Sequence, residues 1–580
     1  MNPIQTAIRQ ASELLKNAYL SAAAAGDLPQ AQLSEPQIEI PRDLRNGDYA
    51  SSFAMQNAKA LHLPPRKIAE ALTAHARLEG TCFSALEIAG PGFLNLRLAH
   101  SWFESVLEGI VREGADYGCT PADKPEKIMV EFVSANPTGP MHMGNARGGV
   151  LGDCLAEVLH RAGNDVTREF YVNDAGNQID KFALSLDARY CQLILGEDAV
   201  PFPEDGYHGS DIKTLAKLFY EEHGDSWLQK DDAERRQALA SFGLEHNIPA
   251  MKADLERYLI HYDVWFFEST LHESGFVADT VQKLTDGGWT YEKEGALWLR
   301  TSALLRNLYQ AEGKTDEEIE KLELKDDVLR RANGFYTYFA ADIAYHRNKF
   351  EVRGFDRVIN IWGADHHGHV ARLKCALDAL GLDGSHRLEI VLMQLVQLVR
   401  DGQPVRMSKR TGNAIALHDL LDEVSVDAAR FFFNSRSAAS PIEFDLGLAV
   451  RQDSDNPVYY VQYAHARIKS ILKALAQDGI STEISSADLT LLTEPAELEL
   501  IRELSHLPEE IRLAAVQRDP SRLNRYATQV AAAFHKFYTE CRIRDAAPAL
   551  RDARILLCSC TAAVIENTLS AFGVSAPDHM

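Results

Sequence analysis

Residues 127–149 read KIMVEFVSANPTGPMHMGNARGG, and this stretch decides the fold of the chain. An apolar run rich in β-forming residues (128–133) leads into a loop with two prolines and two glycines. A helix-like segment follows, and its first turn carries His142, Gly144 and Asn145. Free backbone N–H groups and the helix dipole at such a helix start attract anions. The stretch therefore predicts a phosphate-binding loop between a strand and a helix, although neither GxxxxGKS/T nor GxGxxG occurs in the chain.

A second motif, VRMSKRTG at residues 405–412, lies about 260 residues after the first. Cations beside small, flexible residues can follow negative charge as it moves from one phosphate to the next. Taken alone, each motif is also compatible with an ordinary surface loop. The two together, in this order, favour chemistry on a nucleotide.

The first motif resembles the HxGH signature of class I aminoacyl-tRNA synthetases, and the second resembles their KMSKS loop. In its longer form, SANPTGPMHMGNARGG, the first motif is similar to that of the arginyl-tRNA synthetases. The resemblance extends over about residues 40–580. It implies ATP-dependent ligation of L-arginine to tRNA(Arg) through an arginyl-adenylate, with release of AMP and diphosphate.

The resemblance also implies which residues handle ATP. It assigns catalysis, through stabilisation of the phosphates, to His142, Asn145, Arg406 and Lys409. It assigns contacts with ATP to Gly139, His142, Gly144, Asn145, Gly363, Asp365, His367, Met407, Ser408 and Lys409. Two positions depart from the family pattern. Asn145 stands for the second His and cannot become cationic, whereas Arg406 stands for the first Lys of the loop and keeps its charge.

Recognition of arginine requires planar, charge-assisted acceptors for its guanidinium group. Glu131 lies in the first strand, and Tyr338 and Asp342 are four residues apart, so on a helix they share one face. In the family the residues matching Tyr338 and Asp342 receive the guanidinium. Those matching Glu131, Ser134, Asn136 and His366 contact other parts of arginine. Such a site should reject lysine without editing, because buried acceptors would lose their partners.

The sequence DHHGH at 365–369 also suggests metal ligands, and zinc is the alternative for this segment. The segment follows a strand and opens a helix, where the family holds ATP and part of arginine. We expect Mg²⁺ only as the companion of ATP, and no structural metal bound to the protein.

The predicted fold class is a multidomain α/β plus all-α protein. We expect a small α+β N-terminal domain at 1–120 that contacts tRNA, and a Rossmann-like catalytic domain with a parallel sheet at 121–425. We expect an anticodon-binding helical domain at 426–580. The catalytic domain should hold an insertion at about 180–330, mostly helical, with a strand at 296–301. Within the insertion, residues 302–324 predict a solvated helical hairpin. Later in the catalytic domain, residues 390–399 predict a buried strand followed by a helix start.

The net charge of −23 opposes nucleic-acid binding on average, so a tRNA partner needs a local basic surface. Residues 521–545 carry five basic and two acidic side chains, interleaved with Tyr526, Phe534, Phe537 and Tyr538. This window suits either a nucleic-acid face or an ordinary amphipathic helix. Among the aromatic side chains at 459–463, at least half should belong to the core. The candidate tRNA contacts are Tyr459, Tyr463, Arg522, Arg525 and Arg542.

The remaining composition indicates a cytoplasmic protein without a membrane segment. The family resemblance implies a monomer. No run of 18 uncharged apolar residues occurs, and the eight cysteines include no CxxC pair. Two alternatives stay open: another HxGH ligase, such as a relative of cysteinyl-tRNA synthetase, and a catalytically silent tRNA-binding paralogue. Asn145 favours the second alternative, whereas His142 and Lys409 oppose it.

Overall fold

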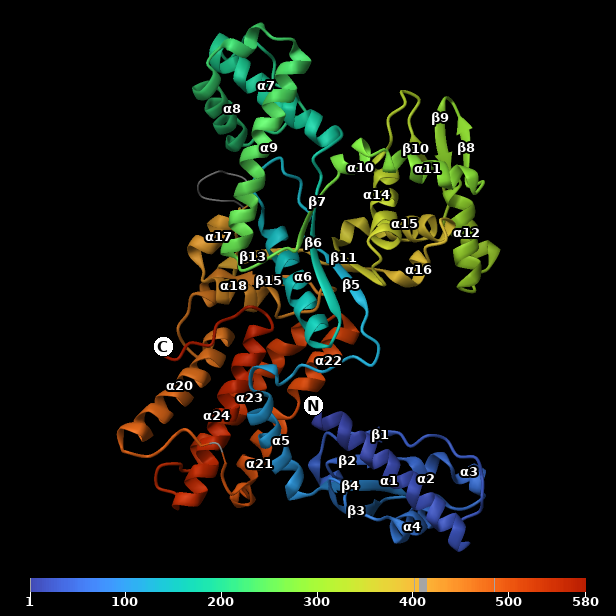
Figure 1. Ribbon diagram of the computed structural model, residues 1–580, viewed down its shortest axis with the longest axis vertical. Helices are drawn as coiled ribbons and strands as arrows, with labels where there is room; N and C mark the ends of the chain where they lie inside the picture. Colours follow the sequence, from blue (N-terminus) through green and yellow to red (C-terminus); the bar gives the residue numbers. More distant parts are fainter. Residues whose placement is uncertain (1, 401, 406–414, 485) are drawn as a thin grey trace.

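The computed structural model describes residues 2–400, 402–405, 415–484 and 486–580. Figure 1 shows an N-terminal domain (blue), a central parallel sheet from which two arms extend, and a C-terminal bundle of helices (orange to red). Among the helices of the described residues, none combines the length and the apolar character needed to cross a bilayer.

The N-terminal domain packs one long helix and three short ones on a small antiparallel sheet. The first helix starts after Asn2, whose side chain accepts from Gln5 N–H, and ends at Gly26 in the left-handed conformation. The sheet has the order β1-β2-β4-β3. The elements are α1 (Pro3–Ala25), β1 (Ile38–Glu39), β2 (Tyr49–Ser51), α2 (Phe53–Gln56), α3 (Ala58–Leu61), α4 (Pro65–His75), β3 (Phe83–Ala89) and β4 (Phe93–Leu98). α5 (His100–Glu113) leads to the central sheet.

The central sheet has five parallel strands in the order β12-β11-β5-β6-β7. The strands are β5 (Lys127–Glu131), β6 (Asp165–Val172), β7 (Val264–Phe267), β11 (Arg357–Gly363) and β12 (Leu388–Met393). From β5 the chain adds β6 and β7 on one side, and later β11 and β12 on the other side. The order of the strands therefore reverses between β5 and β11, which are hydrogen-bonded neighbours. In doubly wound sheets, ligands bind outside the carboxyl ends of the strands at such a switch point. The predicted Rossmann-like sheet is confirmed.

The predicted insertion at 180–330 is not continuous, because β7 belongs to the central sheet. One arm lies before β7 and has its own small core: α7 (Asn177–Leu195), α8 (Ser210–His223) and α9 (Asp232–Arg257). The other arm follows β7: α10 (Ser269–Glu273), α11 (Phe276–Asp286), β8 (Thr290–Lys293), β9 (Ala296–Leu299), α12 (Thr301–Ala311), α13 (Asp316–Glu320), β10 (Asp327–Arg330) and α14 (Tyr338–Arg347). The predicted hairpin at 302–324 corresponds to α12 and α13, and it buries Leu304, Leu305 and Ile319.

The segment 388–400 corrects a second prediction. It forms β12 and then β13 (Val396–Arg400), rather than a strand and a helix start. β13 pairs with β14 (Gln403–Pro404) and, in parallel, with β15 (Ile442–Asp445), so the region 426–580 is not wholly helical. The other elements here are α15 (His367–Ala379), α16 (Gly384–Arg387), α17 (Leu417–Glu423), α18 (Val426–Phe433) and α19 (Leu446–Ala449).

The C-terminal bundle comprises α20 (Pro457–Gln477), α21 (Pro495–Leu504), α22 (Leu507–Gln517), α23 (Ser521–Glu540) and α24 (Pro548–Ser570). One continuous apolar core joins this bundle to α5, to the central sheet and to α6 (Met143–Arg161). The fully buried Arg430 strengthens the junction, since its guanidinium donates to Asp153 (2.5 Å) and to the carbonyl of Phe572 (2.8 Å). The catalytic part and the bundle therefore pack as one unit.

Candidate active site

The loop after β5 turns sharply at the carboxyl edge of the sheet. Val133 and Ser134 have φ angles of +66° and +41°, which are rare for residues with a Cβ, above all for a β-branched valine. Backbone strain of this kind is concentrated at functional sites. The Ser134 hydroxyl donates to Glu131 Oε1 (3.0 Å) and accepts from the backbone N–H of Tyr171 (3.2 Å). These two bonds hold the turn in place.

α6 begins with a reciprocal cap made by two predicted site residues. His142 N–H donates to Asn145 Oδ1 (3.0 Å), and Gly144 N–H donates to His142 Nδ1 (3.1 Å). Because Nδ1 accepts, a neutral His142 carries its proton on Nε2, where it can donate to a ligand. Desolvation lowers the pKa of His142, which favours this neutral form, although part of its side chain stays exposed. Asn145 Nδ2 has no acceptor within the described part of the chain, so it is a second available donor.

The chain that follows the second motif returns to the first one. Met143 N–H donates to Ile415 O (3.1 Å), and Leu417 N–H donates to Met141 O (2.8 Å). His142 and Ala416 form an antiparallel bridge between these two bonds. Four predicted site residues lie outside the described residues: Arg406, Met407, Ser408 and Lys409. Ala416, the second described residue after them, is beside His142.

Two glycines allow close packing around this loop. A Cβ on Gly152 of α6 would lie 2.0 Å from the Phe132 ring, so the helix can approach the strand only with glycine at this position. A Cβ on Gly139 would lie 3.2 Å from the Asp211 carboxylate at the start of α8. Asn247 of α9 also donates to Pro137 O (2.9 Å). The first arm therefore contacts the loop that we expect to bind ATP.

Glu131 is the last residue of β5, and its carboxylate is buried at the switch point. Its Oε2 accepts from Lys349 Nζ (2.5 Å), and its Oε1 accepts from the Ser134 hydroxyl. The neighbouring buried carboxylate, Glu169, likewise has a fixed cation, Arg353. Each of these two carboxylates therefore has its charge balanced by the protein.

Asp342 and Tyr338 lie on α14, as predicted, and Tyr338 is the first residue of the helix. The Asp342 carboxylate accepts from His369 Nε2 (2.6 Å) and lies 3.0 Å from His346 Nδ1. Burial raises the pKa of Asp342, but the charge and hydrogen bonds of the two histidines outweigh it and lower the pKa below its usual range. Tyr338 is 41% exposed, and its hydroxyl accepts from the N–H of Gln178 in the first turn of α7 (3.2 Å).

Glu268 was not predicted, yet it belongs to the same group. It follows β7 directly, is 3% exposed, and accepts from the Tyr171 hydroxyl (2.8 Å). Its other partner is His272 Nε2 (3.3 Å). With Tyr338 it lines a cavity of about 560 Å³. A signal was present in the sequence WFFEST, in which a carboxylate follows a short apolar run, but that run was read as part of a helical insertion.

Tyr171 contacts Glu268 through its hydroxyl and is linked to Glu131 through the Ser134 hydroxyl. Burial raises the pKa of its phenol first, and the charge and hydrogen bond of Glu268 raise it further. The negative charges of Asp342 and Glu131 act in the same direction. Polar contacts also connect Glu131 to Asp342 through Lys349, Asn360 and His346. The acidic groups from both halves of the sheet therefore belong to one network of polar contacts.

The segment 363–369 begins at the last residue of β11, a short 3-10 turn (Ala364–His366) follows, and α15 starts at His367. Asp365, His366 and His367 are exposed, whereas His369 turns inward to Asp342. The four side chains thus point to different surroundings, which disfavours the zinc alternative. Within the described ranges, no three His, Cys, Asp or Glu side chains are placed to hold a metal ion. Asn136, from the loop after β5, is also exposed.

The candidate tRNA contacts do not form one cluster. Arg522 and Arg525 are in the first two turns of α23, and Arg542 follows its end, so roughly 22–27 Å of helix separates them. Arg522 is held by Glu510, with two bonds of 2.9 Å, whereas the Arg542 side chain is 85% exposed. Tyr459 and Tyr463 stack on α20, with ring centroids 6.2 Å apart, and Tyr463 is 40% exposed.

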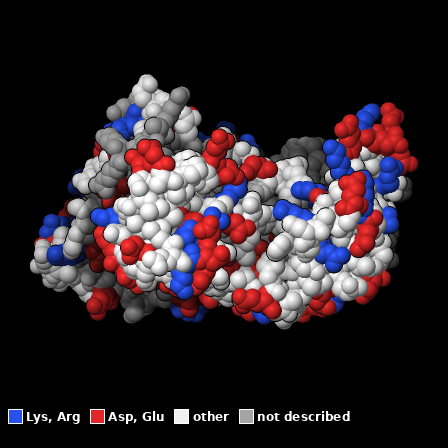
Figure 2. All heavy atoms as spheres, turned by 90° about the horizontal axis from the view of Figure 1, so that it is seen from above, with Lys and Arg blue, Asp and Glu red and all other residues white. Residues whose placement is uncertain are grey.

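The aromatic side chains of α23 favour the ordinary amphipathic helix over the nucleic-acid face, the two alternatives for 521–545. Tyr526, Phe534 and Phe537 are buried in the core of the bundle. Tyr538 instead lies under the Arg467 guanidinium (4.6 Å), and both line a cavity of about 550 Å³ together with Arg542 and Arg544. On the end of the molecule that Figure 2 shows, acidic and basic side chains are interspersed, so the net charge of −23 does not describe every surface.

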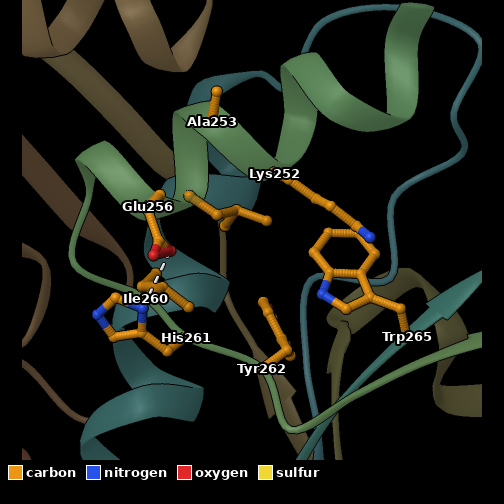
Figure 3. Close-up of a pocket in the computed structure, with 8 residues that line it drawn as sticks. Lys252, Ala253, Glu256, Ile260, His261, Tyr262 and Trp265 are labelled. Atoms are coloured by element: carbon orange, nitrogen blue, oxygen red, sulfur yellow. Dashed lines mark hydrogen bonds and ion pairs between the residues drawn. The ribbon is translucent and has the colours of Figure 1, made fainter. Parts of the chain in front are cut away.

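A further cavity of about 410 Å³ lies between α9 and the start of β7 (Figure 3). Lys252 lies over the Trp265 indole (4.6 Å), and Glu256 pairs with His261 (3.0 Å). None of the predicted site residues lines this cavity.

Three family models together match most of the chain. They are described as "Arginyl tRNA synthetase N terminal domain" (residues 3–98), "tRNA synthetases class I (R), catalytic domain" (107–439) and "DALR anticodon binding domain" (461–580). An arginine–tRNA ligase of Acetivibrio thermocellus is 50% identical over 580 residues and is covered completely, as is this chain. One of Caldanaerobacter subterraneus is also 50% identical over the full length of both.

The structure of an arginyl-tRNA synthetase of Thermus thermophilus has the same fold. It is 22% identical and superimposes with a TM-score of 0.73 over 99% of this chain and 100% of its own. Both motifs, the parallel sheet and the order of the domains agree with these matches. The chain therefore belongs to the arginyl-tRNA synthetase family.

Proposed function

We propose that the protein ligates L-arginine to tRNA(Arg) with ATP, through an arginyl-adenylate, and releases AMP and diphosphate. The observation that carries this proposal is the network of polar contacts that joins Glu131, Glu268 and Asp342 at the switch point of the sheet. Acidic groups that belong to one network suit a small cation, and a helix start with free donors suits its nucleotide partner. Family membership supports the same reaction.

The guanidinium of arginine binds between Glu268, Asp342 and Tyr338. Within the described part of the chain, the first two carboxylates have hydroxyl and imidazole partners but no lysine or arginine. Glu131 and Glu169, in contrast, are each paired with a cation of the protein. A bound guanidinium therefore supplies Glu268 and Asp342 with a permanent positive charge, which their hydroxyl and imidazole partners do not. Glu131, with Ser134, Asn136 and His366, then holds the α-amino end of arginine.

ATP binds along the start of α6, with its phosphates near His142, Gly144 and Asn145 and with Gly139 in the adjoining loop. Gly363, Asp365 and His367 provide the other wall, at the carboxyl end of β11. Mg²⁺ arrives with the phosphates, since this ion is commonly held by few protein carboxylates. In the second motif, Met407 and Ser408 contact ATP, while Arg406 and Lys409 follow the leaving diphosphate.

The reaction needs no side-chain nucleophile. The carboxylate of arginine attacks the α-phosphate in line, and the terminal ribose hydroxyl of tRNA then attacks the carbonyl of the adenylate. The Nε2 proton of His142 and the amide of Asn145 stabilise the phosphate oxygens as charge moves to the diphosphate. The replacement of the second His by Asn145 keeps a hydrogen-bond donor and loses a positive charge.

The tRNA contacts the C-terminal bundle at Tyr459, Tyr463 and Arg542, where exposed aromatic and basic side chains can stack on bases and bind phosphates. Arg522 and Arg525 form a separate, weaker contact at the other end of α23. The N-terminal domain contacts the tRNA as well. We further propose that the protein acts as a monomer in the cytoplasm.

Exchange between ATP and labelled diphosphate, measured with each amino acid, tests this proposal. We expect exchange with arginine, and only after tRNA is added, as is usual in the family. Exchange that depends on another amino acid would show that this amino acid, and not arginine, is the substrate. Absence of exchange with every amino acid, combined with binding of tRNA(Arg), would instead favour a catalytically silent tRNA-binding protein, the alternative that Asn145 raises.

A further inference from the structure

Lys349 is a buried lysine that lies between the two acidic parts of the arginine site. Its side chain is 0% exposed, and it lies in a π-helical turn (Asn348–Val352) that continues α14. Turns of this kind are rare and occur frequently at functional sites. Its ammonium group lies 2.5 Å from Glu131 Oε2, 3.4 Å from Asn360 Oδ1 and 4.0 Å from the centre of the Tyr345 ring.

The hydrogen bonds that leave Lys349 run in one direction. Lys349 donates to Asn360 Oδ1, and the Asn360 amide donates to His346 Nε2 (2.8 Å). The proton of a neutral His346 is therefore on Nδ1, which lies 2.9 Å from the backbone carbonyl of Asp342 and 3.0 Å from its carboxylate. One ammonium group thus donates directly to Glu131 and, through an amide and an imidazole, toward Asp342. Such chains polarise one another in a low-dielectric interior.

Glu131 keeps acceptor capacity despite this pairing. Lys349 uses one lone pair of Oε2 and the Ser134 hydroxyl uses one lone pair of Oε1, so each oxygen can accept one more hydrogen bond. The ion pair of Lys349 and Glu131 is neutral overall. Glu131 can therefore select a substrate by the direction in which the N–H groups of the substrate point, and not by charge alone. The excess negative charge of the site then remains on Glu268 and Asp342.

We infer that Lys349 is a positioning residue for arginine recognition, which orients Glu131 directly and Asp342 through Asn360 and His346. This inference rests on the proposed function, because it takes Glu131 and Asp342 as groups that bind arginine. A role in folding alone is the competing explanation, since a buried ion pair that loses one partner is destabilising wherever it lies.

The test compares Lys349→Met with two matched variants in the exchange assay. Lys349→Met should raise the KM for arginine about tenfold or more and change the KM for ATP less than about twofold. Lys349→Arg keeps the positive charge and should recover most of the loss. Arg353→Met is the control for general damage, because it also strands a buried carboxylate, Glu169, outside the proposed contacts. It should lower the melting temperature without separating the two KM values.

A double-mutant cycle decides whether Lys349 acts through Glu131. In the Glu131→Gln background, Lys349→Met should have less than about twofold further effect on the arginine KM, because the residue that it orients is already altered. The double variant also removes both buried charges, so it provides the comparison even where Lys349→Met alone does not fold. Equal rises in the KM for arginine and ATP, or multiplicative losses in the double variant, would overturn the inference. Failure of the proposed function is distinguishable, since the wild-type protein would then show no arginine-dependent exchange.

Discussion

The proposed arginine site and the proposed tRNA contacts on the C-terminal bundle differ in how their charged side chains are held. In the arginine site, the carboxylates of Glu131 and Glu268 are buried, and their partners hold them in place. On the bundle, the side chains of Arg542 and Arg544 are largely exposed. The difference follows from the size of the ligand. A single small cation must be distinguished from other cations by desolvated, oriented acceptors, whereas a polyanion can be attracted by exposed charges that salt screens.

The largest effect on activity should come from a substitution among the buried carboxylates of the proposed arginine site. Glu268→Gln keeps the shape of the side chain but removes the charge that the guanidinium needs. We expect kcat/KM for arginine to fall by roughly 10²–10³-fold, because an oriented, water-excluded contact is lost. Steady-state exchange kinetics at varied arginine concentration measure this loss, and the KM for ATP serves as the internal reference. A loss of less than about fivefold would remove Glu268 from the guanidinium site.

A smaller loss is expected for the cation that follows the diphosphate. Lys409→Ala should slow adenylate formation at least about tenfold, the low end for removing one donor to developing charge. Rapid-quench measurement of adenylate with saturating arginine isolates this step. Lys473→Ala, an exposed lysine on α20, is the control for a lost surface charge. An unchanged rate in Lys409→Ala would show that the second motif does not act on the leaving group.

Substitution of an exposed arginine on the C-terminal bundle should weaken tRNA binding only moderately, and the effect should depend on salt. Arg542→Ala should raise the KM for tRNA by about three- to tenfold at low salt, and it should reduce the salt slope of binding by about 1. The KM values for arginine and ATP should stay the same. Filter binding across a salt series measures the slope. A loss of affinity that is independent of salt would mean that Arg542 makes a buried, oriented contact instead.

The smallest effect is expected for Arg522→Ala. Glu510 already holds this guanidinium through two hydrogen bonds, so a phosphate would have to compete for it. We expect less than about a twofold change in the KM for tRNA, in the range of an exposed ion pair. The same filter-binding series provides the measurement. A change larger than that of Arg542→Ala would move the main tRNA contact to the start of α23.

Local sequence patterns predicted the helices, strands and turns whose formation depends on residues close to one another in the sequence. The run at 128–133, the prolines and glycines after it, and the cap residues His142 and Asn145 predicted the β5–α6 unit, because turns and helix starts are set by residues close in sequence. The same approach missed β7 and the second strand at 388–400. A short apolar run fits a buried strand or a buried helix equally well, so only pairing with other strands distinguishes them.

The same limit applies to the site residues. Tyr338 and Asp342 are four residues apart, which suggests one helix face, whereas the apolar run before Glu268 fits a helix as well as a strand. The aromatic side chains of α23 left two alternatives open from the sequence, and the packing of the bundle buries three of them.

By itself, the amino-acid sequence determined the chemistry of this protein: which motifs occur, in which order, and at which strand and helix ends they lie. Only the tertiary structure decided which charges meet. Lys349 is 218 residues from Glu131, and Glu268 is 97 residues from Tyr171, yet each pair is in hydrogen-bond contact. Contacts of this kind depend on the order of strands in the sheet, which brings distant carboxyl ends to one edge, and no local pattern in the chain encodes that order.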